Sequence, residues 1–300
     1  MCEDKNWPKV SVAIITYNQK DFLRECIESI LMQDYPNLEI VVADDGYTDG
    51  THEMLFTYEK QYPGLFKLVL SDKNQGITVN SNRAYFACTG EYIAWMGGDD
   101  LMLPGKIHKQ VELMEAHPEI AICYHDLEVF DSASGRVLGY FNHGKGRHYP
   151  YHGTVEKLIL YGTFMGACSV MTRRTCCPKA GFDERIPVAS DWLFWIETAM
   201  SGLIAYLPEI LGRYRRHAGN ITNRPFDGKE ALLTLDIVGE RYCLPESLMR
   251  RGKARVYYSL GTSSLQRGEK REARRYLVKS IRHGWYSYKW VWWIIRATIA

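Results

Sequence analysis

The feature that most constrains the fold is a regular alternation of apolar strand-like runs with helical patterns over roughly the first 125 residues. The first run, Val10–Thr16, is almost continuously apolar and β-branched, which predicts a strand covered on both faces. Further strands are expected at residues 38–43, 66–70, 92–96 and 120–124, and helices from Asp21, from Thr51, at 76–88 and at 104–116. Strands that alternate with helices in this way predict a right-handed, mainly parallel, Rossmann-like α/β sheet.

The second half of the chain has a different pattern. Residues 126–150 resemble hairpin and loop sequence, and short strands are expected at 167–171, 204–207 and 210–214, with a helix at 191–200. After about Ala231 strand signals stop and two or three helices follow, a pair of which weakly resembles one tetratricopeptide unit. We therefore expect an α/β domain over residues 1–225 and a small helical region over 226–300.

The amino-acid composition limits the classes of protein to which the chain can belong. Hydrophobic residues make up 46% and charged residues 24%, which predicts a sizeable core, and the net charge of +2 argues against a general nucleic-acid-binding role. The eight cysteines lack metal-finger spacing and the first nine residues are polar, so we expect a cytoplasmic protein with free thiols. The sequence contains no stretch of about 20 apolar residues, so it predicts no membrane-spanning helix.

Polar clusters follow three of the expected strands, at the edge where open α/β sheets bind ligands. The clusters are Thr16-Tyr17-Asn18, Asp44-Asp45-Gly46 and Asp99-Asp100. Asp45 is placed to accept the imide proton of a pyrimidine, while the Tyr17 ring could stack on the base and Thr16 could bond it. The alternative is that Asp44 and Asp45 merely cap the next turn.

Two further acids and a histidine complete the candidate chemistry. Asp99 and Asp100 follow two glycines, an arrangement suited to a hard divalent cation that also holds phosphate oxygens, or to a solvated turn. Asp191 opens a helix beside tryptophans and is a candidate general base, or an ordinary helix cap. His217 ends an arginine-rich segment. It is a candidate metal ligand or a candidate hydrogen-bond donor to a diphosphate, and the alternative is a structural histidine.

Taken together these motifs resemble family 2 glycosyltransferases of the GT-A fold. The matching segments are VSVAIITYN (10–18), VVADDGYTDGT (41–51), NQG (74–76), NR (82–83), GEYIAWMGGDD (90–100), GFDE (181–184), SDW (190–192) and YRRH (214–217). The resemblance covers roughly residues 8–222 and does not reach the last 75 or so. Two departures are Gly97, where the family often has an acid, and Tyr47, where serine is usual.

The resemblance implies an inverting transfer of a sugar from a UDP- or dTDP-sugar to a hydroxyl of a glycan or lipid-linked glycan, as in bacterial polysaccharide synthesis. It makes Asp191 the general base, and makes Asp100 and His217 the ligands of Mn²⁺ or Mg²⁺. The donor-binding residues it implies are Thr16, Tyr17, Asn18, Asp45, Asn82, Arg83 and Asp99, the last at the ribose or sugar.

Alternatives remain open. The missing acid at Gly97 would also fit a non-catalytic nucleotide-sugar-binding module. A sugar nucleotidyltransferase would need a glycine-rich loop after the first strand, and an NAD-dependent oxidoreductase a Gly-x-Gly-x-x-Gly motif there; neither is present. The basic C-terminal clusters and the aromatic residues 289–296 suit a peripheral membrane interface, or packing within the chain or in a homo-oligomer.

Overall fold

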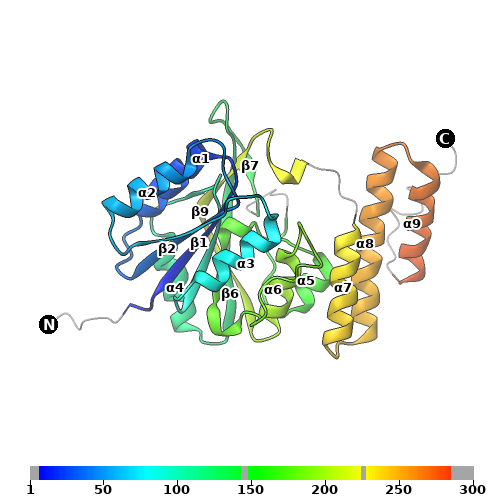
Figure 1. Ribbon diagram of the computed structural model, residues 1–300. Helices are drawn as coiled ribbons and strands as arrows, with labels where there is room; N and C mark the ends of the chain where they lie inside the picture. The colour runs from blue at the N-terminus through cyan, green and yellow to red at the C-terminus, as the bar shows by residue number, and fades with distance from the viewer. Residues whose placement is uncertain (1–6, 143–147, 224–227, 285–300) are drawn as a thin grey trace. The chain divides into compact units, whose positions relative to one another are not determined.

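The computed structural model describes residues 7–142, 148–223 and 228–284 (Figure 1). Contacts within the chain divide it into two compact units. The first comprises residues 1–155 and 163–217, and the second comprises 156–162 and 218–300. The division thus falls after His217 rather than after residue 225, which lies outside the described residues, and a short segment from the middle of the chain groups with the C-terminal helices.

The first unit is built on one nine-stranded sheet with the order β3-β2-β1-β4-β8-β6-β9-β5, and β7 pairs with β6. The strands are β1 (Val10–Thr16), β2 (Leu38–Asp44), β3 (Phe66–Leu70), β4 (Tyr92–Gly97), β5 (Leu101–Met102), β6 (Ile120–Asp131), β7 (Val137–Tyr140), β8 (Val170–Arg173) and β9 (Leu203–Arg216). Strands β1 to β4 are parallel to their neighbours, and β8 then inserts antiparallel between β4 and β6. The expected parallel α/β core is confirmed.

Helices cover the sheet. Those of the first unit are α1 (Lys20–Leu31), α2 (Thr51–Gln61), α3 (Ile77–Ala87), α4 (Lys106–Ala116) and α6 (Asp191–Ala199). Helix α3 packs against β1, β2 and β3, whereas α4 and α6 contact β6 (Figure 1). Val12, Ile14, Ile40 and Val42 are fully buried in the main apolar cluster, while their neighbours Ala13 and Val41 are buried as well, so both faces of the sheet are covered.

Three elements differ from the sequence expectation. Strand β6 runs on to Asp131 and forms a hairpin with β7, where only residues 120–124 were expected. The two short strands expected at 204–207 and 210–214 are one strand, β9, whose register against β6 shifts on either side of Asp126. Residues 167–169 form a single 3₁₀ turn, and only Val170 begins the strand.

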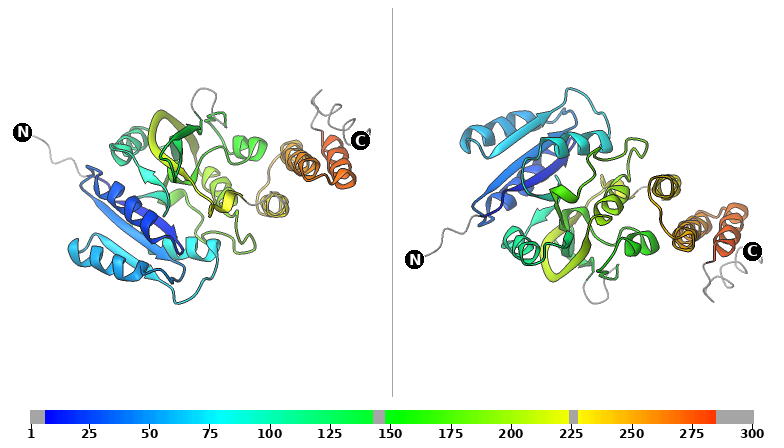
Figure 2. Two further views of the ribbon diagram at one scale, coloured as in Figure 1. Left: turned by 90° about the horizontal axis from the view of Figure 1, so that it is seen from above. Right: turned by 90° about the horizontal axis from the view of Figure 1, so that it is seen from below.

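The second unit is helical. It consists of α5 (Glu156–Tyr161), α7 (Lys229–Arg241), α8 (Glu246–Gln266) and α9 (Lys270–Arg282). Helices α8 and α9 lie side by side (Figure 2), and close approach is possible because a Cβ at Gly261 would lie 2.7 Å from Leu277. Among the described residues, no helix has the length and apolar character that a membrane crossing needs.

Candidate active site

The ends of three parallel strands meet at one edge of the sheet. The strand register pairs Thr16 with Asp44, and it pairs Ile15 with Gly97. The buried Asn80 amide on α3 donates to the backbone oxygens of Ala43 (2.8 Å) and Thr16 (3.4 Å), which locks the first two strand ends together. The predicted polar clusters after β1, β2 and β4 therefore lie beside one another, as parallel pairing requires.

The segment after β1 combines a rigid turn with an exposed ring. Asn18 has a φ of +48°, and its side-chain oxygen accepts from the backbone N–H of Thr48 at 2.8 Å, so Asn18 ties the first loop to the second. Tyr17 is 48% exposed. The buried Thr16 hydroxyl has no hydrogen-bond partner among the described residues, and a Cβ at Gly98 would lie 2.9 Å from it. Glycine at 98 thus keeps space open around a hydroxyl that can still bond a ligand.

Asp45 fixes the loop that begins α3. Its carboxylate is only 3% exposed and accepts the backbone N–H groups of Gln75 and Gly76, each at 2.8 Å. A carboxylate has about four acceptor positions, so the two amides leave capacity for a ligand. Gly46 permits this close approach because its φ is +88° and a Cβ there would lie 2.9 Å from the backbone of Lys73.

The neighbouring Asp44 is buried beneath the edge. Its Oδ2 lies 2.9 Å from Nε2 of His52. Burial raises the pKa of Asp44 from 3.8 to about 6, against the opposing effect of His52. The Tyr47 ring lies on His52 with centroids 3.7 Å apart, so the tyrosine that replaces the usual serine packs over this pair.

Asp99 and His217 are brought together at the end of β4. Oδ2 of Asp99 lies 3.0 Å from Nε2 of His217, and both side chains are partly exposed. His217 immediately follows β9 and lies 118 residues further along the chain than Asp99. A Cβ at Gly97 would lie 2.7 Å from Oδ1 of Asp99, so the glycine that replaces the usual acid leaves room beside this carboxylate.

Asp100 is more deeply buried than its neighbour Asp99. It is only 5% exposed, its Oδ1 accepts the backbone N–H of Arg215 at 2.9 Å, and the thiol of Cys168 also bonds it. Burial and the adjacent Asp99 raise the pKa of Asp100 well above its usual value. Asp99 is thus the acid that contacts His217, while the role of Asp100 as a metal ligand stays a prediction.

A buried lysine lies below this region. Lys106 is fully buried, and its Nζ donates to the backbone oxygen of Cys168 at 2.7 Å. Burial lowers the pKa of Lys106 to about 8. Lys106 and Cys168 were not anticipated from the sequence, because a lysine in an amphipathic helix and a scattered cysteine give no local signal.

The arginines before His217 already have protein partners. Arg213 pairs with Glu128 at 2.6 Å. Arg215 donates to Glu25 and to the backbone oxygen of Asp99, at 2.5 Å and 2.6 Å, while stacking on Phe22 and Phe130. Both guanidinium groups are thus engaged by groups of the protein, and Arg215 positions the Asp99 backbone.

Two of the predicted donor-binding residues are occupied by protein contacts. The Asn82 amide accepts from the backbone N–H of Phe182 at 2.7 Å and donates to Phe182 and Glu184. The Arg83 guanidinium donates to the backbone oxygens of Val69 and Asp44, at 3.0 Å and 3.2 Å. Both residues hold the loops that surround the strand ends, so their effect on a ligand is one of positioning.

Asp191 lies at the start of α6, which side-chain hydrogen bonds link to the start of α3. The backbone N–H of Trp192 donates to Asp191 at 2.8 Å, at the first turn of α6. Its neighbour Ser190 bonds the Thr78 hydroxyl at 2.8 Å, and Thr78 lies two residues beyond Gly76, which Asp45 holds. The start of α6 is thereby connected to the end of β2 through the first turn of α3.

Comparisons with known proteins agree with this fold. Residues 11–176 match the family model for glycosyl transferase family 2. The putative glycosyltransferase EpsE of Bacillus subtilis is 33% identical over 227 residues, which cover 73% of this chain and 77% of EpsE. The uncharacterized Mycobacterium tuberculosis protein Rv1520 is 32% identical over 222 residues, covering 71% of this chain but only 60% of that longer protein.

A solved structure shows the same fold at low identity. S. aureus TarS 1–349 in complex with UDP-GlcNAc superposes with a TM-score of 0.70 and 17% identity, covering 92% of this chain and 81% of TarS. The family model spans more than half of the chain, and helices α7, α8 and α9 lie outside it. The chain belongs to glycosyltransferase family 2 and has the GT-A type of fold.

Proposed function

We propose that the chain is an inverting glycosyltransferase that moves a sugar from a UDP- or dTDP-sugar to a hydroxyl of a glycan or lipid-linked glycan. The observation that carries this proposal is the Asp99–His217 contact of 3.0 Å at the strand edge that also presents Thr16, Tyr17 and Asp45. Family membership and the UDP-GlcNAc complex of TarS support the class of donor.

The nucleoside is proposed to lie between the first two strand ends. The exposed Tyr17 ring offers a stacking surface, and Thr16 has a buried hydroxyl with unused bonding capacity. Asp45, held rigid by the amides of Gln75 and Gly76, can accept the imide N–H of uracil or thymine. Adenine has no ring N–H on its Watson–Crick edge, whereas guanine has one at N1, so the donor screen below includes GDP-sugars.

Asp99 and His217 would hold the divalent cation. Carboxylate oxygen and imidazole nitrogen are both ligands for Mn²⁺, and the space beside Gly97 admits phosphate oxygens next to Asp99. Among the described residues, no group of three or more His, Cys, Asp or Glu side chains is placed to hold a metal ion, so the proposed ion would need ligand atoms from the donor diphosphate. When bound, such an ion neutralises charge on the departing diphosphate.

Asp191 is proposed as the general base. It would accept the proton of the acceptor hydroxyl while that oxygen bonds the anomeric carbon and the bond from this carbon to the diphosphate oxygen breaks. The connection from Asp45 through Gly76, Thr78 and Ser190 holds this acid in a fixed relation to the donor.

The test has two stages. Thermal shift with Mn²⁺ across UDP-, dTDP- and GDP-sugars should show stabilisation by one of the pyrimidine donors and none by GDP-sugars. With that donor, turnover by wild type and by the isosteric Asp191→Asn variant is then compared, and the variant should bind the donor normally but lose turnover. Equal turnover in both would remove Asp191 from the mechanism, and donor binding without any turnover in wild type would favour a binding module.

The remaining expectations stay predictions. They are a cytoplasmic location at the inner face of the membrane, and homo-oligomerisation. Residues 289–296, proposed as an aromatic membrane-interface segment, lie outside the described residues.

A further inference from the structure

Helix α9 concentrates positive charge. Between Lys270 and Arg282 it has six basic residues and one acidic residue, a net charge of +5, whereas the whole chain has a net charge of only +2. The rest of the chain is therefore slightly acidic, and α9 is the source of its basic character. Such a charge imbalance indicates an anionic partner for this helix.

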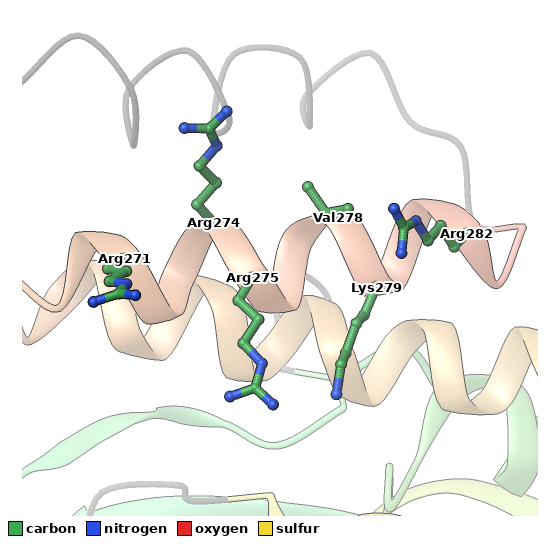
Figure 3. Close-up of a pocket in the computed structure, with 6 residues that line it drawn as sticks. All are labelled: Arg271, Arg274, Arg275, Val278, Lys279 and Arg282. Carbon is green, nitrogen blue, oxygen red and sulfur yellow. The ribbon is translucent and has the colours of Figure 1, made fainter.

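The packing of α9 directs these charges outward. Ala273, Leu277 and Ser280 are buried, with Leu277 close to Gly261 on α8 and the Ser280 hydroxyl bonded to the backbone oxygen of Ala254. The side chains of α9 beside and beyond these contacts are what we call the cationic face, and Figure 3 shows them extending from one helix. One of them, Lys279, lies over the Tyr257 ring of α8 at 5.3 Å. It comprises Arg271, Arg274, Arg275, Val278, Lys279 and Arg282, which together line one surface depression.

The spacing makes the face continuous. Its members fall at helical positions i, i+3, i+4, i+7, i+8 and i+11, so they form one stripe. At 1.5 Å per residue the stripe is about 16 Å long. Figure 3 shows Arg274 and Arg275 pointing to opposite edges of it, so the stripe is also broad.

These charges are not neutralised by the described part of the chain. Within residues 7–142, 148–223 and 228–284, Arg271, Arg274, Arg275 and Arg282 have no salt bridge. Cations nearby do, because Arg267 pairs with Glu269 and Lys253 with Asp236, each at 2.6 Å. Arg271, Arg274 and Arg275 lie within about one helical turn, so their guanidinium groups repel one another, a cost that an anionic partner would offset.

We propose that the cationic face of α9 docks the protein on a bilayer surface that contains anionic lipid. A flat surface of phosphate groups can meet a straight stripe of cations along its whole length, and each cation contributes to adsorption. A glycan fits less well, because its hydroxyls need acceptors as well as donors, and the face supplies only cationic donors and Val278. This docking is independent of the proposed transferase chemistry.

The test uses the full-length chain and two matched triple variants. One removes charge from the face (Arg271→Gln, Arg274→Gln, Arg275→Gln), and the other removes equal charge from exposed positions of the first unit (Lys60→Gln, Arg136→Gln, Lys179→Gln). Both are checked for native far-UV circular dichroism, and a replacement by lysine at the three α9 positions provides a charge-conserving variant. Binding is measured by co-sedimentation with phosphatidylcholine vesicles, with and without phosphatidylglycerol.

We expect three of the proteins to bind vesicles that contain phosphatidylglycerol: wild type, the first-unit variant and the lysine variant. This binding should weaken at high salt, and none of the proteins should bind vesicles of phosphatidylcholine alone. Loss of three cations from α9 should weaken vesicle binding about 100-fold. Turnover of a soluble acceptor should be unchanged by the α9 variant, which separates this inference from the proposed function. Equal vesicle binding by both glutamine variants would overturn the proposal, as would retention on a polyanionic glycan matrix without vesicle binding.

Discussion

The carboxylate of Asp45 supports the site mechanically as well as chemically, and this gives a quantitative prediction for Asp45→Asn. Both of its oxygens accept backbone N–H groups, from Gln75 and from Gly76 at 2.8 Å. An asparagine amide can accept with its oxygen only, so one backbone N–H would face an NH₂ group. A hydrogen bond to a charged acceptor contributes about 1.5–3 kcal/mol, and the unpaired buried N–H adds to the loss.

We therefore expect Asp45→Asn to lower the free energy of unfolding by about 2–3 kcal/mol. In a unit of this size that corresponds to a fall in Tm of roughly 4–12 °C. The variant should also bind UDP at least about 10-fold more weakly, because the acceptor for the imide is lost and the loop that leads to Thr78 loosens.

Differential scanning fluorimetry and isothermal titration with UDP measure the two effects. Asp72→Asn, an exposed position after β3 with the same change of charge, is the matched control and should leave Tm and UDP affinity unchanged. A wild-type Tm and wild-type UDP affinity in Asp45→Asn would refute the assignment of this carboxylate.

Three further predictions concern the fold and the base-binding edge. Burial would raise the pKa of Glu39, but hydrogen bonds from Lys9, Ser11 and Thr89 lower it from 4.5 to about 2. Glu39→Gln should therefore lower the free energy of unfolding by about 3 kcal/mol at pH 7, and by progressively less as the pH falls from 4.5 towards 2. Urea unfolding at several pH values measures this difference. Gly90→Ala should lower the free energy of unfolding by about 1–3 kcal/mol in the same assay, because its Cβ would lie 2.6 Å from the backbone nitrogen of Ser11. Titration calorimetry should show that Tyr17→Ala binds UDP about 10-fold more weakly than wild type, whereas Tyr17→Phe binds it as tightly as wild type. If the two variants bind UDP with the same affinity, the Tyr17 ring does not stack on the base.

The sequence predicts the first half of the fold well because its signals are local. Strands such as Val10–Thr16 are buried on both faces and read as continuous apolar runs, and helices such as α1 have a clear apolar side. The insertion of β8 between β4 and β6 could not be predicted, because β8 follows both strands in the chain and pairs antiparallel with each. The grouping of residues 156–162 with the C-terminal helices also depends on long-range contacts.

The same limit explains what was missed at the site. The sequence predicts that Asp99 and Asp100 lie at a strand end, but it does not predict which of the two adjacent carboxylates is the more buried. That choice depends on the backbone of Arg215, 115 residues away, and on the thiol of Cys168. The pairing of Asp99 with His217 is similarly non-local, whereas the convergence of the strand ends follows from parallel pairing alone.

Manganese-dependent nucleotide binding tests the central claim most directly. Calorimetric titration of UDP, with and without Mn²⁺, is carried out on wild type, Asp99→Asn and His217→Gln, two partly exposed substitutions that leave the buried contacts of Asp100 intact. We predict that Mn²⁺ strengthens UDP binding to wild type. In each variant the increase in UDP affinity caused by Mn²⁺ should be at least about 10-fold smaller than in wild type. If both variants bind UDP with Mn²⁺ as tightly as wild type, Asp99 and His217 do not hold the ion and the proposed site is wrong.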